Sequence, residues 1–259
     1  MSWFYLKSVY DNRSLIWLLA VTDLRLRYRN SVLGFFWSIL EPLLMLTVLY
    51  VVFSFILRSN IQNYPLFLLT GLIVWNAFSR GTVMSSNCIL ARGGIVLNAF
   101  FPRIVLPISA VITSFLMMFF EMLVYIAFVI IFHFQSPPVA ILVPFSLIPL
   151  FLLTLGISLP LSTLNVIYRD ISYIWNVIVQ AGFFLTPIIY TIDIFPKNIQ
   201  SIIMLNPMAH VINWVHDFTL FNKIPTFGSI IFTFGVSIIV FVIGYTVFRR
   251  LEDTMVDKL

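Results

Sequence analysis

Long apolar stretches separated by short polar or charged connections make up most of this 259-residue chain. A helix that crosses about 30 Å of hydrocarbon needs about 20 mostly apolar residues. Six segments with few charged residues match or approach that length: residues 34–57, 64–79, 104–132, 139–168, 171–192 and 227–248. Strands of a membrane barrel alternate apolar and polar residues, whereas the stretch FLMMFFEMLVYIAFVIIF (115–132) is apolar almost throughout. The pattern therefore predicts an all-α membrane protein with six transmembrane helices.

The connection between the fifth and sixth predicted spans, residues 193–226, is too apolar for a free loop. Pro196, Pro207 and Pro225 interrupt it too often for a single span. Irregular backbone at membrane depth is tolerated only where protein buries it or where it lines a watery cavity. We therefore expect a re-entrant external segment that forms the wall or lid of a pathway.

Positive charges orient the predicted helices. Of the fifteen Lys and Arg residues, twelve fall on one side of this topology, including Arg80, Arg92 and Arg103 in the connection between the second and third spans. The positive-inside rule then places both termini of this multi-span protein in the cytoplasm. The predicted parts of this single domain are a cytoplasmic interface helix (1–33), five spans (34–192), the re-entrant segment (193–226), the sixth span (227–248) and a cytoplasmic tail (249–259).

The composition of the chain indicates which classes of partner it can bind. Hydrophobic residues reach 61% and charged residues only 10%, against roughly 45–50% and about 25% in soluble domains. The net charge of +5 forms no basic stripe on a soluble segment, so we expect membrane lipids and no nucleic acid as partners. In the interface helix, Arg25, Arg27 and Arg29 can reach lipid headgroups while their apolar neighbours rest in the interface.

Two acidic residues, Glu41 and Glu121, lie inside predicted spans. A charge at the centre of a membrane helix costs at least about 2.5–3.5 kcal/mol, so each should face a bundle interior, a cavity or an interface. Pro42 removes a backbone donor directly after Glu41, which favours a structural or pathway-lining role for that carboxylate. Proton coupling through Glu41 or Glu121 is the alternative.

Aromatic residues make up 17% of the chain. Most are expected to face lipid or form interfacial belts, but sugar rings stack on aromatic faces without needing buried charge. Six aromatic residues of the first and fifth predicted spans are therefore candidates to line a glycan pathway together with Glu41: Trp37, Tyr50, Phe53, Phe183, Phe184 and Tyr190.

Catalytic and metal sites are not expected. Cys88 is the single cysteine, and His210 and His216 are six residues apart rather than the four that place two ligands on one helix face. His216 precedes Asp217, but no serine or cysteine stands out as a nucleophile beside them. The chain also lacks the G-x-x-x-x-G-K-[ST] motif, so any ATP and Mg²⁺ should be bound by a separate partner chain.

A partner ATPase needs a stiff cytoplasmic element to push on. The connection ARGGIVLNAFFPRIVLP (91–107) offers a turn at Gly93 and Gly94 and then a short apolar stretch. We expect coupling to use three apolar residues and the two flanking arginines, which can pair with partner carboxylates or lipid phosphates: Leu97, Phe100, Phe101, Arg92 and Arg103.

Four stretches carry a resemblance to a known family: RYRNSVLGFFWSILEPLLM (27–45), YRDISYIWN (168–176), FFLTPIIY (183–190) and LNPM (205–208). They resemble the membrane subunits of type-2 ABC exporters for surface polysaccharides such as O-antigen, capsule and teichoic acid. The likeness covers nearly the whole chain. One departure is His216, near a position where an arginine is common in that family.

The resemblance implies a homodimer that works with two copies of a separate nucleotide-binding ATPase and moves a lipid-linked glycan between its subunits. It also implies a location in the inner (cytoplasmic) membrane, an amphipathic interface helix around Arg25–Arg29, short re-entrant helices in 193–226, and ATPase contact through the 91–107 connection and the interface helix. The alternatives are an exporter of drugs or small lipids in the same superfamily and, from a different class, a proton-coupled secondary transporter.

Overall fold

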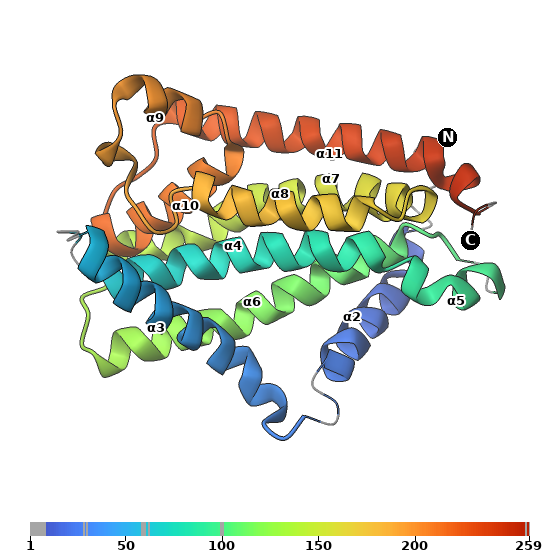
Figure 1. Ribbon diagram of the computed structural model, residues 1–259, viewed down its shortest axis with the longest axis horizontal. Helices are drawn as coiled ribbons and strands as arrows, with labels where there is room; N and C mark the ends of the chain where they lie inside the picture. The colour runs from blue at the N-terminus through green and yellow to red at the C-terminus, as the bar shows by residue number, and fades with distance from the viewer. Residues whose placement is uncertain are drawn as a thin grey trace.

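The computed structural model describes residues 9–27, 29, 31–57, 61, 63–98, 101–256 and 258. All regular structure in these residues is helical, which confirms the predicted all-α class (Figure 1). The α-helices are α2 (Arg13–Arg27), α3 (Trp37–Leu57), α4 (Tyr64–Asn87), α5 (Gly93–Asn98), α6 (Val105–Ile131), α7 (Val143–Ile167), α8 (Ile171–Leu185), α9 (Lys197–Ile203), α10 (Pro207–His216) and α11 (Phe227–Val256). Short 3₁₀ turns are η1 (Gly34–Phe36), η2 (Leu90–Arg92), η3 (Pro138–Leu142) and η4 (Ile192–Ile194), and a π-turn, η5 (Asp217–Phe221), extends α10.

Five helices among the described residues are long and apolar enough to cross a membrane: Trp37–Ser54, Tyr64–Asn87, Val105–Ile131, Pro138–Ile167 and Phe227–Met255. The fifth predicted span, 171–192, is helical only as α8, which has 15 residues and is therefore about 22 Å long. It ends at Leu185 because Thr186 is extended, a conformation that the following Pro187 favours.

The second predicted span, 64–79, is short for a membrane helix, and an extension toward Leu90 was expected. Helix α4 continues two turns beyond residue 79 and ends at Asn87. The prediction that placed Arg80 in the following connection is therefore wrong, and Arg80 lies inside the helix. The apolar pattern broke at Arg80, but a buried ion pair, described below, allows the helix to continue.

Helix α4 is the centre of the bundle (Figure 1). In its most apolar stretch 78% of the residues are buried, whereas only 17% are buried in the corresponding stretch of α11. It packs against α3, α6, α7, α8 and α10, and His216 of α10 contacts Phe67 near its N-terminal end.

Helices α7 and α11 approach so closely that glycine is required on both. A Cβ atom added to Gly244 would lie 1.8 Å from the carbonyl oxygen of Gly156. One added to Gly156 would lie 2.7 Å from the Cα atom of Phe241. Small residues of this kind let membrane helices bring their backbones into contact.

The bundle has two ends of different character. Helices α2 and α5 and the C-terminal part of α11 gather at one end, whereas α9 and α10 lie at the other (Figure 1). At the α2–α5 end, a buried apolar cluster joins Ile89, Val96, Leu106, Phe248 and Met255. Segments predicted to be cytoplasmic therefore share one end of the molecule.

We predict that Gly244→Ala destabilises the protein by more than the roughly 1–3 kcal/mol typical of overpacking, because backbone atoms cannot move aside. Gly235→Ala is the matched control, since Gly235 lies on the same helix with no atom within 4 Å of an added Cβ. Thermal unfolding in lipid nanodiscs measures both variants. Equal melting temperatures for the two would contradict the close α7–α11 contact.

Candidate functional site

The segment after α8 folds back onto the bundle through caps and long-range hydrogen bonds. Pro207 occupies the first turn of α10, and the Asn206 side chain accepts a hydrogen bond from the Met208 amide at 3.0 Å. Asn206 also donates to the Thr186 hydroxyl at 3.2 Å. The Tyr64 hydroxyl donates to the Ile189 carbonyl at 2.9 Å, which joins the segment to α4. The LNPM stretch thus begins a buried helix.

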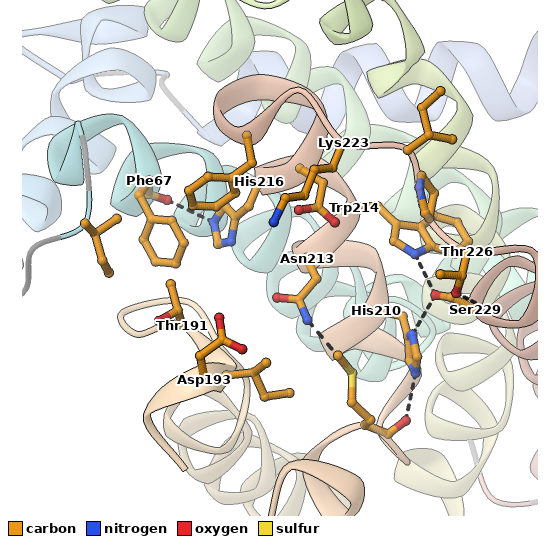
Figure 2. Close-up of a pocket in the computed structure, with 17 residues that line it drawn as sticks. Phe67, Thr191, Asp193, His210, Asn213, Trp214, His216, Lys223, Thr226 and Ser229 are labelled. Carbon is orange, nitrogen blue, oxygen red and sulfur yellow. Dashed lines mark hydrogen bonds between the residues drawn. The ribbon is translucent and has the colours of Figure 1, made fainter. Parts of the chain in front are cut away.

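A pocket of about 680 Å³ opens beside α10 (Figure 2). Helix α10 and the π-turn supply about half of its polar side chains, and Asp193 approaches from the opposite side. Its aromatic surfaces come from three different elements. The wall of the pocket includes Phe67, Asp193, Asn213, Trp214, His216, Asp217, Phe221 and Lys223.

A chain of hydrogen bonds fixes one side of the pocket. His210 Nε2 lies 2.8 Å from the Met204 carbonyl, which can only accept, so this nitrogen carries the proton. His210 Nδ1 then accepts from the Ser229 hydroxyl at 2.8 Å. Ser229 in turn accepts from Trp214 Nε1 at 2.9 Å. The first turn of α11 and α10 are thereby held together.

His216 is the most deeply buried polar residue of the pocket, with 2% of its surface exposed. Its Nε2 donates to the Phe67 carbonyl at 3.0 Å, and its ring stacks on that of Phe67 at 3.8 Å between centroids. Burial lowers the pKa of His216 to about 3 despite the hydrogen bond to Phe67. His216 is therefore neutral at physiological pH.

The pKa of Asp217 shifts in the opposite direction. Burial raises its pKa to about 6; Lys223 opposes this effect and Asp193 adds to it. The pKa of His210 is lowered by burial, an effect that its hydrogen bond with Met204 opposes. Burial in the pocket therefore favours the neutral form of all three groups: it lowers the pKa of the two histidines and raises that of Asp217.

A second polar feature lies inside the bundle. Arg80 of α4 donates to Glu121 of α6 at 2.5 Å, and only 12% and 1% of these side chains are exposed. Glu121 was predicted to face a bundle interior, and the structure gives it a cationic partner there. Arg80 was not among the expected site residues, because its pairing depends on two helices separated by 41 positions.

At the α2–α5 end, Arg92 pairs with Asp23 of α2, and both side chains are largely buried. Arg92 was expected to pair with a partner protein or lipid; within the chain it pairs with Asp23, and its contact with a partner stays a prediction. Arg27 lies 3.8 Å from Glu41, with the Glu41 side chain 52% exposed. Arg25 and Arg29 are exposed, and Arg103 is half-buried.

The apolar coupling residues are only partly covered. Phe101 is half-buried against the cluster at the α2–α5 end. Phe100 and the Leu97 side chain lie outside the described residues. Their contact with an ATPase stays a prediction.

The six aromatic candidates do not form one lining. Tyr50 approaches Tyr64 at 6.2 Å, and Phe183 meets Trp75 edge-on at 6.1 Å, so both pack on α4. Phe53 is half-buried in the same core, whereas Trp37 and Phe184 are exposed. Tyr190 is buried, and its hydroxyl donates to the Phe184 carbonyl at 3.0 Å.

Comparison with known proteins defines the class. Residues 14–218 match the family described as ABC-2 type transporter. The chain therefore belongs to the membrane subunits of the ABC-2 transporter family.

Its relatives are named for polysaccharide export. The chain is 33% identical to the O-antigen export system permease protein RfbA of Klebsiella pneumoniae, over 98% of this chain and 99% of that protein. It is 25% identical to the polysialic acid transport protein KpsM of Escherichia coli, over 93% and 94% of the two chains. It is 23% identical to the capsule polysaccharide export inner-membrane protein CtrC of Neisseria meningitidis, over 80% and 79%.

We predict an asymmetric response at the buried ion pair. Glu121→Ala leaves an arginine that stays charged, and such a loss typically costs about 3–5 kcal/mol. Arg80→Ala should cost less, because an isolated carboxyl can become neutral by taking a proton. The double variant Arg80→Met/Glu121→Met should regain most of the stability lost in Glu121→Ala. Unfolding in nanodiscs measures all three, and a larger loss for Arg80→Ala would overturn this account.

A separate prediction concerns pH. Between pH 7 and 5, His216 takes up a proton in the unfolded chain but stays neutral in the folded chain. Acid therefore favours the unfolded chain and lowers stability through this group. Asp217 acts oppositely, because its folded form takes up a proton before its unfolded form does. Asp217→Asn should therefore lose more stability than the unsubstituted protein when pH falls from 7 to 5. Melting temperatures at the two pH values measure this, and identical losses would contradict the assignment.

Proposed function

We propose that this chain is the transmembrane subunit of an ATP-driven exporter that moves a lipid-linked polysaccharide across the cytoplasmic membrane. The observation that carries the proposal is the match along almost the full length of both chains to an O-antigen export permease. ATP and Mg²⁺ belong to a partner ATPase in this proposal.

The arrangement of ion pairs supports export driven by a partner over proton coupling. Glu121 is bound to Arg80, and Glu41 lies near Arg27. At Glu121, the Arg80 guanidinium 2.5 Å away favours the charged carboxylate, which supports a structural role. Glu41 is half exposed and 3.8 Å from Arg27, so this argument applies to Glu121 alone.

We propose a homodimer with six spans per subunit, in which the two copies face each other across α3 and α8. Both helices pack on α4 and expose apolar side chains, among them Tyr50 and Val51 on α3 and Val177 and Phe184 on α8. Helix α8 acts as the fifth span in this arrangement, together with the chain that follows it to Tyr190, and so completes the six. A glycan path between the subunits would place Trp37, Tyr50 and Phe184 near the substrate.

Two ATPase copies are proposed to act at the α2–α5 end, with both termini in the cytoplasm. The Asp23–Arg92 pair joins the interface helix to the turn that precedes α5. Thr113 of α6 donates to the Ala20 carbonyl at 3.2 Å, so motion of α2 reaches a spanning helix directly. Force applied at α5 can therefore pass through α2 into the bundle.

The function is tested in a strain that lacks the gene. Surface polysaccharide should disappear and lipid-linked glycan should accumulate inside, and the unsubstituted gene should restore export only with an active partner ATPase. Restored export with a hydrolysis-deficient ATPase would favour the secondary transporter.

The coupling route is tested by reversing charges. Arg92→Glu places two carboxylates together and should reduce surface polysaccharide severalfold while the protein still inserts in the membrane. The double variant Asp23→Arg/Arg92→Glu restores the opposite charges and should restore export. Arg250→Glu is the control, because it makes the same change on an exposed arginine of α11. Failure of the double variant to improve on Arg92→Glu would show that the pair carries no coupling.

A further inference from the structure

The pocket beside α10 contains a polar atom that the fold leaves without a partner. His216 Nδ1 is buried and has no hydrogen-bond partner among the residues that the structure describes. Because Nε2 donates to the Phe67 carbonyl and the ring is neutral, Nδ1 carries a lone pair and must accept. A buried acceptor without a donor costs about 1–3 kcal/mol. Packing gives no reason for this cost, since the Nε2 contact alone positions the ring.

Other polar groups surround the same space. Figure 2 shows Asp193 approaching from the loop opposite His216 and Asn213. Asn213 donates only to the Met204 sulfur, at 3.9 Å, a weak bond that an oxygen ligand would replace. Asp217 adds a carboxyl group and Lys223 an ammonium group.

The composition of the wall specifies the ligand chemistry. Among its charged groups the two carboxyl groups outnumber the single lysine, and the His216 nitrogen adds a further acceptor. Two carboxyl groups disfavour an anionic ligand, and the described residues contain no group of three His, Cys, Asp or Glu that could hold a metal ion. Phe67 and Phe221 add apolar surfaces. A neutral molecule rich in hydroxyl donors, with an apolar face, fits this wall.

Size agrees with that chemistry. A pocket of about 680 Å³ lies within the range of roughly 300–1,000 Å³ typical of small-molecule sites. It also opens to the surface beside exposed Asp193, so a unit of a longer chain can enter while its neighbours stay outside.

We propose that this pocket binds a sugar unit of the exported glycan, with His216 Nδ1 accepting a hydrogen bond from a sugar hydroxyl. This inference rests on the proposed function, and it adds a glycan contact outside the aromatic candidates of α3 and α8. The aspartates accept from further hydroxyls, and the sugar ring lies against the aromatic wall.

The test uses the permease–ATPase complex in nanodiscs and the delipidated surface polysaccharide of the strain that carries the gene. Isothermal titration should show binding to the unsubstituted complex. His216→Gln keeps a donor near the position of Nε2 and removes the Nδ1 acceptor, so affinity should fall roughly three- to tenfold, the effect of one hydrogen bond. His133→Gln makes the same change on an exposed histidine outside the pocket and should bind normally. Absence of binding to the unsubstituted complex, or equal affinity in all three, would overturn the proposal.

A second variant tests the proposal if the His216→Gln complex does not assemble. Asp193 is exposed on the opposite wall, so Asp193→Ala should assemble and still weaken polysaccharide binding. Unchanged affinity in Asp193→Ala, with His216→Gln unfolded, overturns the proposal.

Lipid headgroups with hydroxyls are the other source of this chemistry. Native mass spectrometry of complexes from nanodiscs with and without phosphatidylglycerol counts retained lipid. The proposal expects equal retention in the unsubstituted and His216→Gln complexes, and reduced retention in the variant would assign the pocket to the headgroup instead. Normal export in the gene-replacement assay without polysaccharide binding would reject the pocket and leave the proposed function standing.

Discussion

The fold depends on one helix that has almost no contact with lipid or solvent. Because α4 is buried on nearly all sides, neither water nor headgroups can satisfy its polar groups. Its neighbours do so instead. Ser114 of α6 donates to the Ala77 carbonyl at 2.6 Å, and Asn165 at the end of α7 donates to the Ser86 carbonyl at 2.9 Å. Each bond fixes one neighbouring helix against α4.

The need of α4 for polar partners also connects the two ends of the molecule. At one end His216 donates to a carbonyl near the start of α4. At the other end Asn165 links the end of α4 to the start of α8, because its oxygen also accepts from the Ser172 amide at 3.0 Å. Arg80 and Glu121 hold the middle of α4 to α6. A shift of α4 would therefore change contacts at the pocket and at the α2–α5 end together, which suits the proposed exporter, driven from one side and releasing substrate on the other.

Sequence patterns predicted much of this arrangement, and their failures have physical causes. Spans were visible because lipid demands long apolar runs, and the 193–226 segment stood out because prolines broke an apolar stretch. Arg80 was misplaced because hydropathy treats a charge as the end of a span, whereas a partner on another helix can keep that charge buried. The fifth span was drawn through to residue 192 because apolar content continues after Pro187 although the helix does not.

The sequence by itself determined the helical membrane class, the approximate spans, the acidic residues that need partners and the family likeness, because these depend on composition and on local order. Only the tertiary structure decided which groups meet. It paired Arg80 with Glu121 and Arg92 with Asp23, brought Gly156 to Gly244, and placed His216 against Phe67 with one nitrogen left facing a pocket. These contacts join residues between 41 and 149 positions apart. Their formation depends on how the helices pack, and that packing has no signature in any single stretch of the chain.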